Sequence, residues 1–279
     1  MHGLDPALRE RVLAKLGFPA PPLPDRAGLA ALYASWCQRV PFDNLRKLLH
    51  VRSGDPGPLP GDTPADFFAA WLAHGTGGTC WAGNGALCAL LESLGFAARR
   101  GIATMLVAPD LSPNHGTVSV RLDGATWLVD ASLLHGAPLR LDPAHETEVP
   151  HPAWGARARP DGGRWLVRWR PQHRPEGLDC RIDALDGSAA DFAALHEATR
   201  GWSPFNYSLY LRVQRGGRVI GAAFGQRVEI DERGAVAQQA LDPHERRRLL
   251  EEAGISAAVA AALPDDRPLP PPPGVAPSP

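Results

Sequence analysis

The chain has 279 residues, of which 44% are hydrophobic, and its formal net charge is −1 at pH 7. A chain of this size can bury a substantial core. Its near-neutral charge leaves no broad electrostatic surface for nucleic acid or for an anionic membrane. We therefore expect a globular protein that acts on small molecules, with no nucleic-acid or membrane partner.

The sequence shows no membrane span, secretion signal or disulfide framework. No run of about 18 apolar residues occurs without a charge, and charged side chains interrupt residues 1–20. The four cysteines are irregularly spaced and form no C-x-x-C pair: Cys37, Cys80, Cys88 and Cys180. Such spacing is typical of free thiols in a reducing compartment, so we expect a cytoplasmic protein.

The first third of the chain has a helical pattern. Apolar residues recur at three- and four-residue spacing over 8–16 and 29–36, which predicts two amphipathic helices. A loop rich in glycine and proline is expected over 51–63, followed by an apolar helix around 67–72. A further apolar stripe over 81–94 is closed by Gly95. Cys80 therefore lies at the start of a helix.

After Phe96 the pattern changes to short alternating runs, at 102–107, 117–122, 127–129 and 165–169. These runs predict a β-sheet or barrel, whereas 138–163 is expected to form a long irregular connection. The final third predicts a helix near 192–199, strands at 207–213 and 219–224, and a helix near 243–252. The proline-rich tail over 264–279 is expected to be disordered or extended, and dispensable for chemistry.

The segment Gly77-Gly78-Thr79-Cys80 delivers a cysteine to a helix N-terminus. Unpaired backbone N–H groups and the positive end of the helix dipole favour a thiolate there, and the same N–H groups can stabilise an oxyanion. The alternative is a cysteine that only packs in the core, as we expect for Cys88 on the apolar stripe.

Alternating residues on both sides of Asp123-Gly124 predict a β-hairpin, because this dipeptide favours a two-residue turn. Counting back from the turn places Thr117 opposite Asp130, and His115 shares the face of Thr117. His115 and Asp130 then become diagonal neighbours. The carboxylate can fix the tautomer of the imidazole, whose other nitrogen faces the thiol. A surface histidine and a strand-end aspartate are the alternatives.

Neither a metal site nor a nucleotide-binding fold is expected. His74, Cys80 and Cys88 are separated by six and eight residues, which does not match compact zinc-ligand pairs. No P-loop and no strand-linked G-x-G-x-x-G sequence occurs. A CoA donor would have to be held by scattered contacts.

The same residues resemble the arylamine N-acetyltransferases and their relatives. Residues 39–45 (RVPFDNL) are similar to the family's proline-phenylalanine-acid-asparagine-leucine box, and residues 77–84 (GGTCWAGN) to its glycine-glycine-x-cysteine box with a later asparagine. Residues 114–116 (NHG) and 127–130 (WLVD) resemble its histidine and aspartate segments. With the later similarities at 203–206 and 243–255, the resemblance covers roughly residues 8–255.

The resemblance implies an α+β fold with a papain-like Cys-His-Asp core. The nucleophile would lie in an N-terminal helical bundle over 1–100, and the histidine and aspartate in a central β-barrel over 101–185. An α/β lid would follow over 186–263, with the disordered proline-rich tail over 264–279.

The resemblance also implies ping-pong acyl transfer. Cys80 would take an acyl group from acyl-CoA or from a thioester on an acyl carrier protein, and pass it to a small amine, with His115 and Asp130 completing the catalytic triad. Five residues are candidates for substrate binding, with core packing as the alternative for each: Phe42, Thr79, Trp81, Trp202 and Phe205.

Three positions depart from the family pattern. The family usually has an arginine before the glycine pair and a glutamate two residues after the cysteine, where this chain has Thr76 and Ala82, and the box acid is Asp43. A charged network that braces the cysteine loop is therefore missing or rebuilt, which favours a specialised substrate, as in natural-product biosynthesis. A thioester-releasing amide synthase or cyclase, a cysteine hydrolase or transglutaminase-like enzyme, and a degenerate non-catalytic binding protein are the alternatives.

Overall fold

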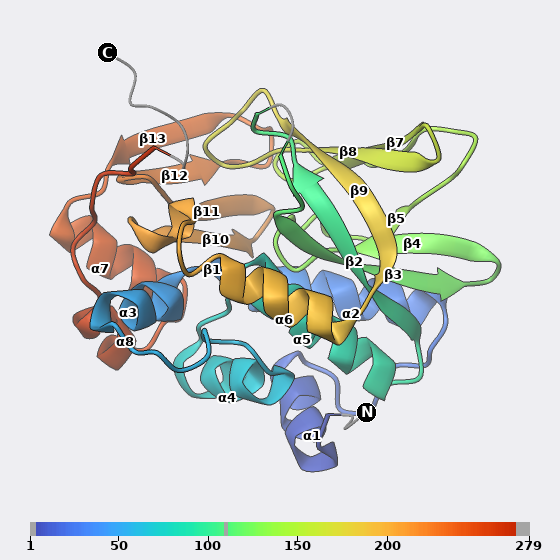
Figure 1. Ribbon diagram of the computed structural model, residues 1–279, viewed down its shortest axis with the longest axis horizontal. Helices are drawn as coiled ribbons and strands as arrows, with labels where there is room; N and C mark the ends of the chain where they lie inside the picture. Colours follow the sequence, from blue (N-terminus) through green and yellow to red (C-terminus); the bar gives the residue numbers. More distant parts are fainter. Residues whose placement is uncertain (1–3, 109–110, 272–279) are drawn as a thin grey trace.

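The computed structural model describes residues 4–108 and 111–271 as a mixed α+β fold (Figure 1). Helices dominate the first third of the chain, a large antiparallel sheet the middle, and a smaller sheet with flanking helices the last third. The buried apolar residues form three clusters: a large one that joins the N-terminal helices to both sheets, one within the large sheet, and one within the smaller sheet and its helices. No helix within the described residues is long and apolar enough to cross a membrane.

The N-terminal helices begin where polar side chains cap them. Asp5, Asp25 and Thr63 each accept a backbone N–H of the first turn that would otherwise lack a partner. The helices are α1 (Pro6–Lys15), α2 (Arg26–Arg39), α3 (Leu45–Ser53), α4 (Pro64–His74) and α5 (Cys80–Ser93). The predicted helices are confirmed, but α3 was not predicted, and the loop over 51–63 begins only after it.

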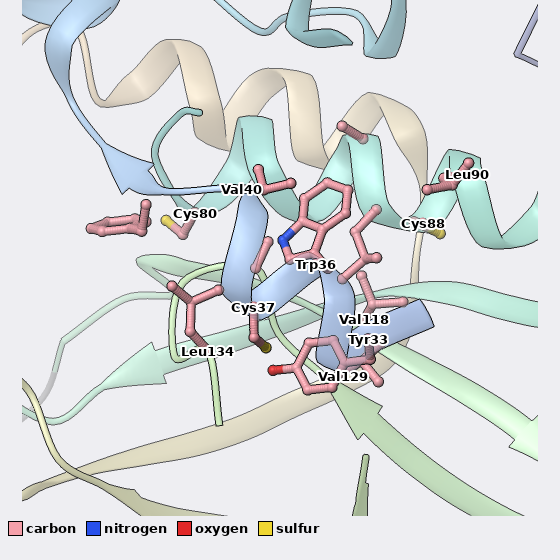
Figure 2. Packing of buried hydrophobic residues seen from close by; sticks show 14 of the residues in the cluster. Tyr33, Trp36, Cys37, Val40, Cys80, Cys88, Leu90, Val118, Val129 and Leu134 are labelled. Carbon is pink, nitrogen blue, oxygen red and sulfur yellow. The ribbon is translucent and has the colours of Figure 1, made fainter. Parts of the chain in front are cut away.

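Helix α2 fills the space between α5 and the neighbouring strands, as Figure 2 shows with Tyr33 and Trp36. Trp36 is fully buried and Tyr33 is 1% exposed. Cys80 lies at one end of α5, whereas Cys88 lies further along it inside the apolar cluster (Figure 2). Burial raises the pKa of the Cys88 thiol to about 12, so Cys88 packs as expected. All four cysteines are free and buried.

The large sheet is antiparallel and nearly closes into a barrel. Its strand order is β5-β4-β3-β2-β9-β8-β7-β6. The two end strands meet, because the Thr147 hydroxyl at the start of β6 donates to the Arg140 carbonyl in β5. The strands are β2 (Ala97–Met105), β3 (His115–Leu122), β4 (Ala125–Val129), β5 (Leu139–Arg140), β6 (Thr147–Val149), β7 (Ala156–Asp161), β8 (Arg164–Trp169) and β9 (Leu178–Gly187).

The segment over 138–163, predicted to be irregular, contributes β5, β6 and β7, so that prediction was wrong. Two of these strands are only two and three residues long. In β7 the buried positions include Ala156 and Ala158, which alternate with exposed Arg157 and Arg159. Alanine gives a weak hydrophobic signal, and pairing with β8 supplies the hydrogen bonds that hold this strand.

The smaller sheet joins distant parts of the chain. Strand β1 (Phe42–Asp43) pairs with β10 (Tyr210–Arg215) and also bridges to Gly78, which anchors this sheet beside the segment that precedes Cys80. The remaining elements of this lid are β11 (Arg218–Ala223), β12 (Gln226–Ile230), β13 (Val236–Ala240), α6 (Ala189–Ala198), the short 3-10 helix η1 (Pro204–Asn206), α7 (Pro243–Glu252) and α8 (Ala257–Ala262). Strands β1, β9, β12 and β13 and helix α8 were not predicted.

The expected ranges of the three parts differ in detail from the elements. The barrel strands begin at Ala97 and end at Gly187, and Leu45 of α3 packs with the lid rather than with the helical bundle. The described part of the tail is extended but tethered, because Asp266 accepts the Leu209 N–H at 3.0 Å and the Arg267 N–H donates to the Tyr207 carbonyl at 2.8 Å. The expected disorder does not describe residues 264–271, and residues 272–279 lie outside the described residues.

Candidate active site

Cys80 is the first residue of α5, directly after the capping residue Thr79. The first bond of the helix runs from the Gly83 N–H to the Thr79 carbonyl at 2.8 Å. The N–H groups of Cys80, Trp81 and Ala82 have no acceptor among the described residues, and the Thr79 side chain does not cap them. Partial positive charge therefore collects beside the Cys80 sulfur, which is 3.9 Å from the Asn114 carbonyl oxygen.

The glycine loop, residues 76–79, is held by the acid of the box. One carboxylate oxygen of Asp43 accepts the Gly77 N–H at 2.6 Å, and the other accepts the Leu45 N–H at 3.0 Å. Burial raises the pKa of Asp43 to about 6, although these two N–H groups and Arg46 act in the opposite direction. Gly77 approaches the Pro41 carbonyl so closely that a Cβ would lie 1.8 Å from its oxygen. A side chain there would push the loop away from β1.

Two of the three departures from the family pattern are buried without a polar partner. Thr76 is fully buried, and its hydroxyl has no partner within the described part of the chain. Ala82 is 2% exposed, and its methyl group lies against Gly61 and Gly78, near the Phe67 ring. Neither residue supplies a charge to the cysteine loop.

The β3–β4 hairpin has the predicted register, with Cα partners running from Leu122 and Ala125 at the turn to Val118 and Val129. Asp123 and Gly124 both have positive φ, 52° and 72°, as a two-residue turn of this type requires. The prediction of a hairpin turning at this dipeptide is confirmed.

This register brings His115 and Asp130 together. The His115 Nε2 atom is 2.8 Å from Asp130 Oδ2, and the two residues are 2% and 0% exposed. Burial lowers the pKa of His115, but the Asp130 carboxylate, together with the influence of the Cys80 side chain, outweighs burial and raises the pKa to about 10. Burial likewise raises the pKa of Asp130, but the charge of His115 and its hydrogen bond lower it to about 2. The pair is therefore an imidazolium and a carboxylate.

The other oxygen of Asp130 is fixed by the backbone. Oδ1 accepts the Ser132 N–H at 2.8 Å and the Leu133 N–H at 3.0 Å. The Tyr33 hydroxyl donates to the Asp130 carbonyl at 2.8 Å and accepts the Asp130 N–H at 3.1 Å. Tyr33 was not predicted to take part, because it belongs to the apolar stripe of α2, 97 residues away.

Asn84 joins the helix that carries Cys80 to the strands that carry the histidine and aspartate. Its amide nitrogen donates to the Gly116 carbonyl at 2.6 Å, and its oxygen accepts the Ala131 N–H at 2.9 Å. Asn84 is four residues after Cys80, hence on the same face of the helix. This spacing was the available signal for a positioning role that the sequence argument did not assign.

The candidate substrate-binding residues fall into separate groups. Phe42 packs edge to face against Phe205 and against Tyr210, with ring centroids 5.4 Å apart in each case. Trp81 packs in the same manner on Phe192 of α6, at 5.0 Å. The structure therefore brings Phe42 and Phe205 together at the bridge to the glycine loop.

Thr79 and Trp202 make neither of these aromatic contacts. Thr79 occupies the N-cap position of α5, directly before Cys80, without a side-chain capping bond, and is 5% exposed. The Trp202 indole N–H donates to the Pro270 carbonyl at 3.4 Å, so Trp202 contacts the tail. Over residues 4–108 and 111–271, no group of three or more His, Cys, Asp or Glu side chains is placed to hold a metal ion.

Fold and site together define an α+β protein in which a cysteine at a helix start lies beside a buried histidine–aspartate pair. Residues 26–174, just over half of the chain, match the family described as N-acetyltransferase. A curated relative, the arylamine N-acetyltransferase of Mycolicibacterium smegmatis, is 30% identical over 149 residues, which cover 50% of this chain and 52% of that protein. The chain belongs to the arylamine N-acetyltransferase family, and the match spans about half the length of this curated relative.

Solved structures of arylamine N-acetyltransferases share the fold along most of the chain. The Mycobacterium abscessus protein has a TM-score of 0.75 at 22% identity, covering 91% of this chain and 92% of that one. The Mycobacterium marinum protein in complex with CoA has a TM-score of 0.73 at 17% identity, covering 90% and 97%. The Salmonella typhimurium protein also has a TM-score of 0.73, at 20% identity, covering 94% and 100%.

Proposed function

We propose that this protein is a cysteine-dependent acyltransferase that moves an acyl group from acyl-CoA to a small amine by a ping-pong mechanism. The observation that carries the proposal is the buried His115–Asp130 pair, joined at 2.8 Å, beside a cysteine at a helix start. Relatives named arylamine N-acetyltransferase support an amine acceptor, and the CoA complex of one neighbour supports CoA as the donor.

In the first half-reaction, the proton of Cys80 is already held on Nδ1 of the His115 imidazolium, and the Cys80 thiolate attacks the thioester carbonyl carbon. The oxyanion that forms lies toward the N–H groups at the start of α5. Collapse breaks the bond between the carbonyl carbon and the CoA sulfur. CoA leaves as a thiol after taking the proton from the His115 imidazolium, and Cys80 keeps the acyl group.

In the second half-reaction, the amine nitrogen attacks the carbonyl carbon of acyl-Cys80. His115 removes the proton from the attacking nitrogen and keeps it as an imidazolium, while Cys80 departs as a thiolate, which regenerates the enzyme. Asp130 stays ionised throughout, because its role is to fix the tautomer of His115 and to stabilise the imidazolium. Water or an internal nucleophile in place of the amine would give hydrolysis or cyclisation.

The acceptor is proposed to be specialised, because Thr76 and Ala82 stand where the family usually carries charge. The role in natural-product biosynthesis and the carrier-protein donor stay predictions from the sequence. We place acyl-CoA first as the donor because a structural neighbour was solved with CoA.

Initial-rate kinetics test this function. Release of free CoA thiol from acetyl-CoA is followed at varied concentrations of an arylamine, beside the Cys80→Ser variant. Ping-pong transfer predicts parallel double-reciprocal lines and no release by the variant. Intersecting lines would mean direct transfer within a ternary complex. Release of CoA at a rate independent of the amine concentration would mean hydrolysis.

A further inference from the structure

Lys47, on helix α3, carries a buried ammonium group without a carboxylate partner. The residue is 4% exposed, and its Nζ donates to the Thr199 hydroxyl at 2.7 Å. That hydroxyl donates in turn to the His196 carbonyl at 2.7 Å. Within the described residues no Asp or Glu oxygen comes within 4.0 Å of Nζ. A buried charge is normally paired, so donors of Lys47 remain available to a ligand.

Lysine is a rare choice in this chain. Only Lys15 and Lys47 are lysines among 29 basic residues. The Nζ of Lys15 has a defined task, since it donates to the Trp71 carbonyl and lies over that residue's ring. A lysine presents a compact charge on a flexible stem, whereas arginine presents a wide planar fork. The buried position of Lys47 suits the compact charge.

The elements that hold Lys47 adjoin those that hold the nucleophile. Helix α3 follows β1, where the Asp43 N–H donates to the Gly78 carbonyl at 3.3 Å. Helix α6 packs on the start of α5 through Phe192 and Trp81, and its other end, which carries Thr199, lies beside α3 (Figure 1). Burial lowers the pKa of Lys47 to about 7, and a negative charge on Cys80 acts to raise it.

His196 adds a second buried polar atom with no protein partner. Its Nε2 is 3.3 Å from the Pro60 carbonyl, and its Nδ1 has no partner among the described residues. Burial and the charge of Lys47 lower the pKa of His196 to about 4, so the ring is neutral. The local positive charge therefore belongs to Lys47 and, further out, to Arg200, which is paired with Glu197.

We propose that Lys47 binds the distal carboxylate of the acyl group carried by Cys80, so that the preferred donors are monothioesters of dicarboxylic acids. This inference rests on the proposed function, because that function supplies the acyl group on Cys80. The anion subsite at Lys47 does not depend on it. The acyl chain is attached to Cys80 through both half-reactions, and a carboxylate at its far end stays near the ammonium of Lys47. The acceptor amine, by contrast, is never covalently attached to the protein, so it is not held near Lys47.

Alkylation of Cys80 in the full-length protein tests the subsite without any acyl transfer. Iodoacetate and iodoacetamide have similar size and the same leaving group, but only iodoacetate is negative. An unscreened ammonium beside the sulfur predicts a ratio of iodoacetate to iodoacetamide rates about tenfold higher than in the Lys47→Met variant. The Lys15→Met variant loses the same charge elsewhere and is expected to keep the wild-type ratio.

The ratio of iodoacetate to iodoacetamide rates for wild-type Cys80 is also compared with the same ratio for N-acetylcysteinamide, a neutral cysteine derivative. This comparison needs no variant, so it still tests the subsite if a variant fails to fold. A wild-type ratio no higher than that of the free thiol overturns the proposal. Equal slowing of both reagents in Lys47→Met also overturns it, because Lys47 would then act on the thiolate alone.

The donor class is tested by acylation with succinyl-CoA and with butyryl-CoA, which have the same number of acyl carbons. Wild type is expected to react about tenfold faster with succinyl-CoA, and Lys47→Met is expected to lose this preference. Equal rates in the wild type contradict the donor class. Failure of both donors to acylate Cys80 refutes the proposed function instead, while the alkylation ratio still reports on the subsite.

Discussion

Replacing Asp130 by asparagine separates the charge of this carboxylate from its packing. The two side chains have nearly the same shape, and the asparagine oxygen can still accept the N–H groups of Ser132 and Leu133. The amide nitrogen then faces His115 Nε2, to which it can only donate. The proton of a neutral imidazole is forced onto Nδ1, the nitrogen that has to receive the proton of Cys80.

The size of the effect follows from the pKa of His115. It is raised from 6.5 to about 10 in the folded protein, which corresponds to on the order of 5 kcal/mol in favour of the imidazolium. Without the carboxylate, burial, the largest influence on this pKa, disfavours the charged ring, and only the Cys80 side chain opposes it. A cysteine with the ordinary thiol pKa of about 8.5 is only about 0.3% thiolate at pH 6. Loss of the imidazolium should therefore slow alkylation of Cys80 about 100-fold at that pH.

The assay is the iodoacetamide rate of Cys80 between pH 5 and pH 9, followed by intact mass on wild type and on Asp130→Asn. The other three cysteines are fully or almost fully buried and serve as an internal check on folding. A rate at pH 6 that changes less than about threefold in a folded variant would refute the role given to Asp130, since the charge would then not control the thiol.

Three further predictions follow from the same contacts. Asn84→Ala leaves the Gly116 carbonyl and the Ala131 N–H without partners, and urea denaturation should show a loss of about 1 to 3 kcal/mol. Asp43→Ala should lower the free energy of unfolding by about as much, whereas Asp43→Asn, which keeps one acceptor for the glycine loop, should lower it less. The stability difference between wild type and Asp130→Asn should depend on pH, as urea midpoints would show. Because the pKa of His115 is raised, the stability that His115 contributes is full below pH 6.5 and is lost as pH rises through about 10. Because the pKa of Asp130 is lowered, the stability that Asp130 contributes is full above pH 3.8 and is lost as pH falls through about 2.

The hairpin and the helix start were predictable because their determinants are local. The turn at Asp123-Gly124 fixes the register of the strands around it, and the position of His115 beside Asp130 follows from counting along two strands. Cys80 likewise follows directly from the glycines before it and the apolar stripe after it. Each of these features depends on fewer than about 20 neighbouring residues.

The missed strands depend on their hydrogen-bonded partners more than on a pattern of their own. Strand β1 is two residues long and exists because it lies between β10 and the glycine loop. Strands β12 and β13 are partly exposed and rich in polar residues, so they give little alternating signal. Their hydrogen-bonded neighbours, rather than their own propensity, make them strands.

The supporting side chains of the site were harder to assign than the reacting ones. Tyr33 and Asn84 have ordinary positions on apolar helix faces, and only the folded chain brings their polar atoms to Asp130 and to the hairpin. The replacement of the expected charges by Thr76 and Ala82 was visible in the sequence. That the Asp43 carboxylate holds the glycine loop was not visible, because the contact joins β1 to a loop more than 30 residues later.

Intact-mass measurement of the protein after brief exposure to acyl-CoA tests covalent catalysis by Cys80 most directly. We expect a mass increase of one acyl group on wild type, no increase on Cys80→Ala, and return to the starting mass when an amine acceptor is added, with the acyl amide as product. Labelling that survives the Cys80→Ala substitution would contradict the mechanism, as would an unlabelled wild-type protein that nevertheless turns over acyl-CoA and amine.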